Sequence, residues 1–175
     1  MTLDIVDGLY NIIRLKPFRR TTGVRFDVLV RHDVPKVDAV DRVIHIQGAV
    51  SPGSIAGVKR PWYMHTHQDD NLLVLSGRRE VELYNQSHGK IESFTVTPDR
   101  IERNGRILID EPAILVWPRY VFHRVKSGDH GSISVNLATH YDGFNLKDNF
   151  NIYDLDPETG DYRIIRQGFL DQMPV

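Results

Sequence analysis

The chain carries, from Gly57 to Gly77, the stretch GVKRPWYMHTHQDDNLLVLSG, and from Pro118 to His123 the stretch PRYVFH. The first stretch contains His65 and His67, which are two residues apart. In a β-strand, side chains two positions apart point to the same face, so both imidazoles can be directed at one point. His123 supplies a third imidazole from the second stretch. Imidazoles that converge in this way suit a first-row transition metal.

The two stretches resemble the two sequence boxes of the cupin superfamily. The first resembles the box in which a glycine, an H-x-H pair, a carboxylate and a closing glycine recur, and the second resembles P-x-G-x-x-H. The resemblance covers roughly residues 57–137 and depends on both boxes occurring in order. It departs from the pattern at Tyr120, which replaces the glycine of the second box, and in the carboxylates, which follow His67 sooner than usual. It implies an all-β fold, a double-stranded β-helix (jelly-roll, cupin-like) barrel.

The resemblance also implies a metal site, in which His65, His67 and His123 bind a divalent ion together with one carboxylate. Asp70 is the first choice for that carboxylate, because counting back from the closing glycine puts it where cupins have a glutamate. Asp69 is the alternative, because its parity matches the two histidines if the strand continues. Such ligands accept manganese, iron, nickel, zinc or cobalt, so they do not identify the metal.

Composition limits the classes of partner. The chain has 175 residues, a formal net charge of −1 and no cysteine. Nucleic acids and anionic membranes both require a basic surplus, so neither is an expected partner. Without cysteine there is neither a disulfide framework nor a thiolate metal site. The longest apolar runs are too short to cross a bilayer and no secretory signal is recognisable, so we expect a cytoplasmic protein.

Short segments of alternating polarity, separated by turn residues, predict a sandwich or barrel. Val24–Val30 is predicted as a half-buried strand, and Trp62–Gln68 as one continuous strand that carries the histidine pair. Leu9–Leu15 is compatible with a short helix or an edge strand. Asn104-Gly105 and the stretch 156–161 predict hairpins. We therefore expect a single domain over residues 1–175, with a core at roughly 57–137 and extra N- and C-terminal strands.

The N-terminal strands predict an oligomer. Val24–Val30 and Arg42–Gly48 need partners that a minimal cupin core does not supply. In related cupins such strands often join the sheet of a second subunit, so the resemblance implies a homodimer.

Aromatic residues surround both boxes and are candidates for a substrate pocket. Trp62, Tyr63 and Tyr120 are predicted to line it, although each alone is also compatible with core packing. Arg119 is predicted to bind an anionic group of a small-molecule ligand through paired hydrogen bonds.

Two further histidines and one pair of arginines lie on or beside predicted strands outside the two boxes. His140, at the end of a strand, is a candidate general acid or base, with a surface histidine as the alternative. The parity of His45 predicts that it faces solvent or an interface. Arg78 and Arg79 are interpreted as part of an ordinary charged strand face.

Three functions are compatible with these features. The first is a metal-dependent enzyme acting on a small polar or anionic molecule, of the dioxygenase, decarboxylase or isomerase type. The second is a non-catalytic module that binds a small molecule or sugar, with the metal structural or absent. The third, a metal-free sugar-nucleotide epimerase, needs a histidine–carboxylate base pair, and the three histidines favour a metal instead. The enzyme is the preferred hypothesis, and its reaction stays open because one fold supports many chemistries.

Overall fold

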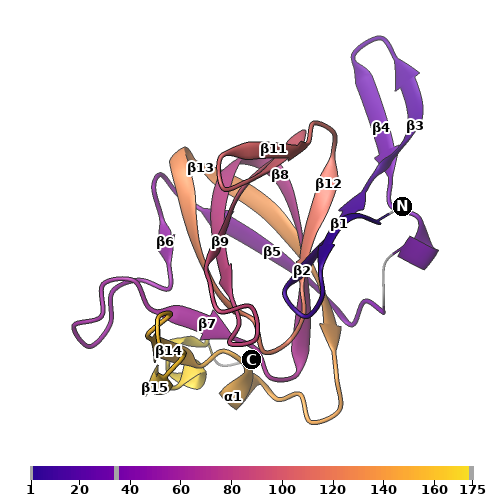
Figure 1. Cartoon of the computed structure of the whole chain (residues 1–175). Helices are drawn as coiled ribbons and strands as arrows, with labels where there is room; N and C mark the ends of the chain where they lie inside the picture. Colours follow the sequence, from indigo (N-terminus) through magenta and orange to yellow (C-terminus); the bar gives the residue numbers. More distant parts are fainter. Residues whose placement is uncertain (1, 34–35, 174–175) are drawn as a thin grey trace.

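Two long antiparallel strands form the framework of the barrel. β8 (Gln68–Tyr84) and β13 (Phe122–His140) pair along almost their whole length. Both curve through the body of the molecule, so each passes from one end of the barrel to the other (Figure 1). The computed structural model describes residues 2–33 and 36–173.

The remaining strands extend from this pair. The strands on the β8 side are β1 (Thr2–Val6), β2 (Tyr10–Arg14), β12 (Ala113–Trp117), β9 (Glu92–Thr97), β10 (Arg100–Arg103) and β11 (Arg106–Ile109). Those on the β13 side are β5 (Ala39–His45), β6 (Val50–Ser51), β7 (Trp62–Met64), β14 (Ile152–Leu155) and β15 (Tyr162–Arg166). The short helical turns are η1 (Arg31–Asp33), α1 (Leu146–Asn149) and η2 (Gly168–Asp171). Within the described part of the chain, no helix is long and apolar enough to cross a membrane.

A bulge in β8 changes which side chains face the interior. Val74 and Ser76 pair with consecutive residues of β13, so Leu75 between them is an extra residue. Before the bulge the even-numbered side chains of β8 face inward, and from residue 79 onward the odd-numbered ones do. Gly77 follows the bulge with a φ of +74°, and a Cβ here would collide with the backbone of Gly131 on β13.

The apolar core fills one part of the barrel interior. Inward-facing side chains of β8, β9, β10 and β12 form it, including Val81, Phe94, Ile101 and Leu115, all of which are fully buried. Burial of each such side chain stabilises the fold by about 1.5–3 kcal/mol. The rest of the interior carries polar as well as apolar side chains and contains the cavity described below.

Most sequence predictions of the fold are confirmed. The protein is an antiparallel, nearly all-β barrel with extra strands at both ends of the chain. Asn104 and Gly105 both have positive φ, of 49° and 76°, and connect β10 to β11. The stretch 156–161 connects β14 to β15, and Leu9–Leu15 contains the strand β2.

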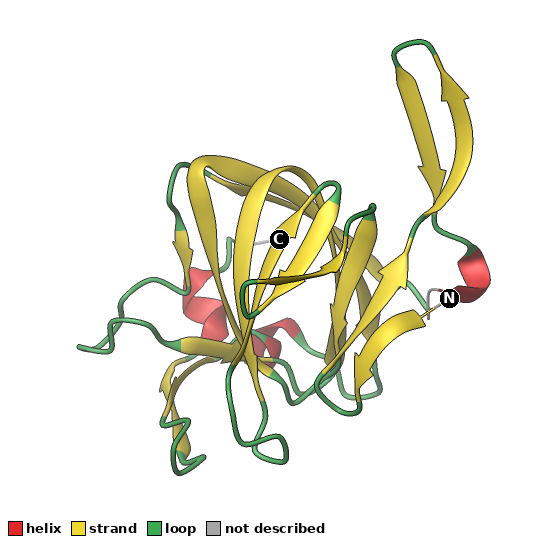
Figure 2. Cartoon of the chain, turned by 45° about the horizontal axis from the view of Figure 1, so that its top comes forward, coloured by secondary structure: helices red, strands yellow, loops and turns green. Residues whose placement is uncertain are grey.

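Two predicted strands differ from the structure. The predicted strand Trp62–Gln68 is interrupted, because β7 ends at Met64 and β8 begins at Gln68. The predicted half-buried strand Val24–Val30 is instead β4 (Val24–Val28), which pairs with β3 (Lys16–Thr21) in a separate hairpin. That hairpin projects away from the barrel and is largely exposed (Figure 2).

Candidate functional site

A cavity of about 240 Å³ opens into the barrel interior. Its walls come from β5, β8 and β13, from the ends of β7 and β12, and from the segment that follows α1. It is lined by both polar and apolar side chains, among them His45, Tyr63, Arg79, Trp117 and Phe150. A concave site with a few convergent polar groups is the usual form of a small-molecule site.

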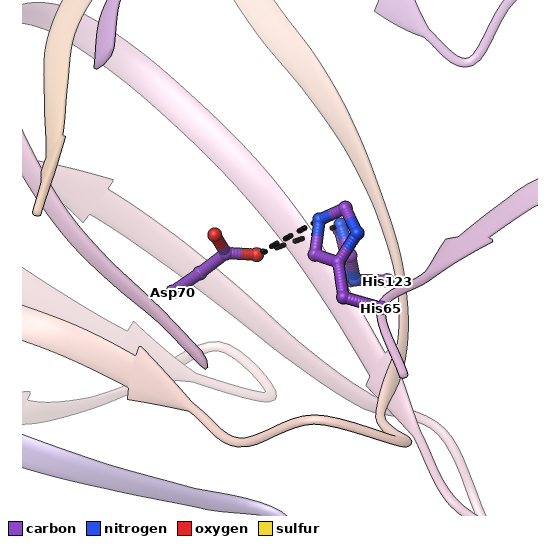
Figure 3. Close-up of side chains that lie close together, drawn as sticks. All are labelled: His65, Asp70 and His123. Atoms are coloured by element: carbon purple, nitrogen blue, oxygen red, sulfur yellow. Dashed lines mark ion pairs between the residues drawn. The ribbon is translucent and has the colours of Figure 1, made fainter. Parts of the chain in front are cut away.

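Three buried side chains meet in this cavity: His65, Asp70 and His123 (Figure 3). His65 follows β7, Asp70 lies near the start of β8, and His123 near the start of β13. Oδ2 of Asp70 is 3.3 Å from Nε2 of His65 and 3.8 Å from Nε2 of His123. Both imidazoles therefore face one carboxylate oxygen.

The backbone fixes the orientation of both imidazoles. Nδ1 of His65 donates to the carbonyl oxygen of Asn149 at 2.5 Å, and Nδ1 of His123 to that of Val121 at 3.2 Å. A proton on each Nδ1 leaves Nε2 as the nitrogen available for other chemistry. This is also the arrangement that histidine ligands of metals commonly have.

Two amides hold the carboxylate of Asp70. Oδ1 accepts hydrogen bonds from Nε2 of Gln68 at 2.7 Å and from Nδ2 of Asn136 at 2.6 Å. Gln68 in turn accepts a hydrogen bond from Asn149, whose carbonyl oxygen binds His65. Because Oδ1 is occupied, Oδ2 is left to face the imidazoles.

The three groups differ in protonation. Burial alone would lower the pKa of His65, but the adjacent carboxylate of Asp70 reverses this and raises the pKa above its usual value. Burial likewise opposes ionisation of Asp70, yet His65 and the amide donors hold the pKa of that carboxyl well below its usual range. Burial, with the charge of His65, lowers the pKa of His123 to about 4. These opposite shifts favour a charged His65 beside an ionised Asp70, and a neutral His123.

The donor set matches that of a divalent transition metal. Two imidazole nitrogens and one carboxylate oxygen all lie within 4.8 Å of one another. Two histidines and a carboxylate with open positions are a known ligand set for first-row divalent ions. The residues that would hold such an ion are therefore His65, Asp70 and His123.

His67 lies outside this cluster. Its Nδ1 is 2.8 Å from Oγ1 of Thr66, and its ring packs against Gly143. The expectation that His65 and His67 share one strand face is not met, because residues 65–67 connect two strands. Of the two histidines of the first stretch, the structure brings His65 to Asp70 and leaves His67 apart.

Asp69, the alternative carboxylate, faces the barrel rim. Oδ1 accepts from the backbone N–H of Arg119 at 2.7 Å, and Oδ2 from the hydroxyl of Tyr141 at 2.6 Å. The structure therefore brings Asp70, rather than Asp69, to the two imidazoles.

Of the aromatic residues predicted to bind substrate, Tyr63 lines the cavity. Trp62 is buried in a separate apolar cluster, with the guanidinium of Arg124 4.0 Å from its ring. Tyr120 is 55% exposed and has a φ of +67°, so it keeps the backbone conformation expected of the glycine that it replaces.

Two other predicted site residues lie away from the cavity lining. Arg119 is exposed, with its guanidinium 4.3 Å from the ring of Tyr141. His140 stacks on Phe144, with ring centroids 3.6 Å apart. Neither residue contributes to the cavity wall.

Sequence reasoning missed Arg79 and His45, which both line the cavity. His45 lies on the inner face of β5 with Asp41 and Val43, whereas the alternate residues Val40 and Ile44 are exposed. The parity of β5 gave the wrong side for His45, because the apolar residues Val40 and Ile44 lie on the exposed face of the strand. Arg79 was interpreted as part of an exposed charged strand face, whereas its inward direction depends on the bulge in β8.

Comparisons with known proteins identify a shared fold. No protein-family model matches the chain, and no curated protein matches it in sequence. Among solved structures, dTDP-4-dehydrorhamnose 3,5-epimerase from Sulfolobus tokodaii is 16% identical, with a TM-score of 0.57 over 82% of this chain and 77% of that chain. The sugar 3,4-ketoisomerase QdtA from Thermoanaerobacterium thermosaccharolyticum, in complex with TDP, is 15% identical, with a TM-score of 0.50 over 78% and 84%. The fold is therefore a cupin jelly roll.

Proposed function

We propose that this cupin-fold protein is an isomerase or epimerase that moves protons on a small, hydroxylated carbonyl compound of the sugar class. The observation that carries the proposal is the buried meeting of His65, Asp70 and His123, which gives two imidazoles in different protonation states. Groups whose pKa values are pushed apart in one site are the usual basis of acid–base catalysis. The names of the two structural neighbours, an epimerase and a ketoisomerase of sugars, support the substrate class.

Each imidazole has one role in the proposed reaction. Neutral His123 accepts a proton at Nε2 from the carbon next to the substrate carbonyl, while protonated His65 donates its Nε2 proton to the carbonyl oxygen. The carbon–hydrogen bond breaks and its electron pair becomes part of a new carbon–carbon double bond, while the π pair of the carbonyl forms the new O–H bond, which gives an enediol. His123 then returns its proton to the former carbonyl carbon and His65 regains a proton from the neighbouring hydroxyl, so the carbonyl has moved by one carbon and both imidazoles are restored. Asp70 stabilises the charged state of His65 by the ion pair.

A second candidate keeps the predicted metal. The convergent donors of His65, Asp70 and His123 support a site for one divalent ion among manganese, iron, nickel, zinc and cobalt. A bound ion would supply polarisation of a carbonyl oxygen. Here the backbone bonds to both Nδ1 atoms would hold the imidazoles in place for coordination.

Deuterium exchange tests the proposed reaction. TDP-4-keto-6-deoxyglucose and a panel of simple keto sugars would be incubated with the protein in D₂O, and deuterium at carbon followed by NMR. We expect exchange that His65→Gln and His123→Gln each reduce by about 100-fold or more, with His67→Gln as the control. Parallel samples with EDTA, and with each metal added back, separate the two candidates. Binding of a sugar without exchange in any sample would support a binding module and refute the enzyme.

We also propose that the protein is a homodimer. The outer face of β5 and its neighbours is apolar and exposed, notably at Val40 and Ile44 on β5, at Ile46 directly after β5, and at Ile133 on β13. Among the described strands, β5 pairs only with β13, so its other edge is open. An open edge beside an apolar face is typical of an interface, and a second copy supplies a matching face.

A further inference from the structure

Arg79 is a buried cation without an anionic partner. Its side chain comes from β8 and the residue is only 4% exposed. Nε donates to Oγ of Ser132 at 3.0 Å, and Nη2 to the carbonyl oxygen of Val43 at 3.3 Å. Both acceptors are neutral, and Arg79 forms no ion pair with any carboxylate of the described residues.

Burial of an unpaired charge is unfavourable, so this arrangement needs an explanation. Burial lowers the pKa of Arg79 to about 10, which leaves the guanidinium protonated at neutral pH. If Arg79 served only to connect the strands through these hydrogen bonds, a neutral polar side chain could do so at a lower cost in desolvation. The neighbouring Arg78 shows the ordinary alternative, since it is exposed and pairs with Glu80.

The cavity has a different character at its two ends. Along the inner face of β5, Asp41 lies near the three-residue cluster, where Asn136 donates to both Asp41 and Asp70. His45 lies four residues further, about 13 Å along the strand. His45 belongs to the arginine end, because Ser127 connects it to Ser132, the partner of Arg79.

The guanidinium of Arg79 supplies the positive charge of the arginine end. Burial, with Arg79 nearby, lowers the pKa of His45 to about 4, so His45 is neutral there at neutral pH. Ser127 and Ser132 are neutral hydroxyls. A ligand that reaches this end from the histidine cluster therefore meets a guanidinium surrounded by neutral polar groups, which favours an oxyanion.

We propose that Arg79 binds a carboxylate or phosphate monoester group of a substrate whose reactive carbonyl lies between His65 and His123. The inference rests on the proposed function and specifies its substrate class as sugar acids or sugar phosphates. Guanidinium groups bind such oxyanions through paired, charge-assisted hydrogen bonds. The cavity of about 240 Å³ encloses a molecule smaller than a typical drug-sized ligand.

Calorimetric titration tests the inference with D-glucuronate, D-glucose 6-phosphate and inorganic phosphate as probes, and D-glucose as the neutral counterpart. The wild type is expected to bind at least one oxyanion probe at least tenfold more tightly than D-glucose. Arg79→Gln should lose that preference by tenfold or more. Arg78→Gln, the matched control on the same strand, should keep it within twofold. Comparison of the glucuronate and phosphate series distinguishes the two oxyanions.

Arg79→Lys is a second variant, which keeps the test valid if Arg79→Gln fails to fold. It keeps the buried charge but cannot form paired hydrogen bonds, so it should weaken oxyanion binding about fivefold or more. The inference is overturned if the wild type binds no oxyanion probe, or if both Arg79 variants bind them as the wild type does. His65→Gln should abolish deuterium exchange and keep oxyanion binding. Absent exchange in the wild type with intact oxyanion binding would refute the proposed reaction alone.

Discussion

Asn136 donates a hydrogen bond of 2.6 Å to Oδ1 of Asp70 and thereby turns the other carboxylate oxygen toward the imidazoles. Asn136→Leu has a similar volume but cannot donate, so Asp70 is expected to rotate and the ion pair with His65 to weaken. Loss of such an orienting partner commonly costs about 10–100-fold in activity or metal affinity. Deuterium exchange and metal titration both measure this. An unchanged exchange rate would mean that Gln68 alone orients the carboxylate.

Metal titration distinguishes the residues of the cluster from their sequence neighbours. If the second candidate function holds, purified protein carries about one divalent ion per chain, held by His65, Asp70 and His123. Asp70→Ala should weaken binding more than Asp69→Ala, because Asp69 instead accepts hydrogen bonds at the rim. His67→Ala should bind metal as the wild type does, whereas His65→Ala should not. The assignment fails if His67→Ala loses the metal.

The pKa shifts predict the pH dependence of exchange in EDTA-treated protein. His123 must be neutral to accept a proton, so activity should rise as pH increases through about 4. His65 must be protonated to donate, so activity should fall above its raised pKa, which lies above the usual value of 6.5. Asp70→Asn removes the charge that raises the pKa of His65, so the upper limb should move to lower pH. An upper limb that stays in place would exclude His65 as the acid.

The open face of β5 predicts the oligomeric state. Ile44→Glu and Ile46→Glu together should convert a dimer to a monomer in sedimentation equilibrium, because two desolvated charges oppose association. Ile107→Glu on β11, which replaces another exposed isoleucine, is the matched control and should remain dimeric. A wild-type protein that sediments as a monomer would refute the dimer itself.

The sequence predicted features that depend on local rules. Asn104-Gly105 predicts its hairpin because few other residue pairs adopt two consecutive positive φ values. The barrel was predicted from short segments of alternating polarity and from the resemblance of the two stretches to the cupin boxes. These predictions need no knowledge of how distant strands pair.

The sequence could not predict features that depend on irregular backbone. His65 and His67 point apart because the strand stops at Met64, and no turn residue between them marks that interruption. Arg119 lies within the second box, directly after Pro118, yet it is on the rim because the backbone turns outward there, where its N–H donates to Asp69. In both cases the tertiary structure interrupts the strand, so the two-residue alternation of side-chain direction does not apply.

The bulge at Leu75 has a consequence for how such a site arises. If β8 paired residue by residue with β13 through Leu75, with no bulge, the even-numbered side chains would continue to face inward, and Arg78 rather than Arg79 would point toward the interior. A change in strand pairing would therefore exchange a buried guanidinium for a surface one without altering either side chain. In a lineage of barrels built on this pair of strands, gain or loss of the bulge at constant chain length would be enough to gain or lose the charge in the cavity.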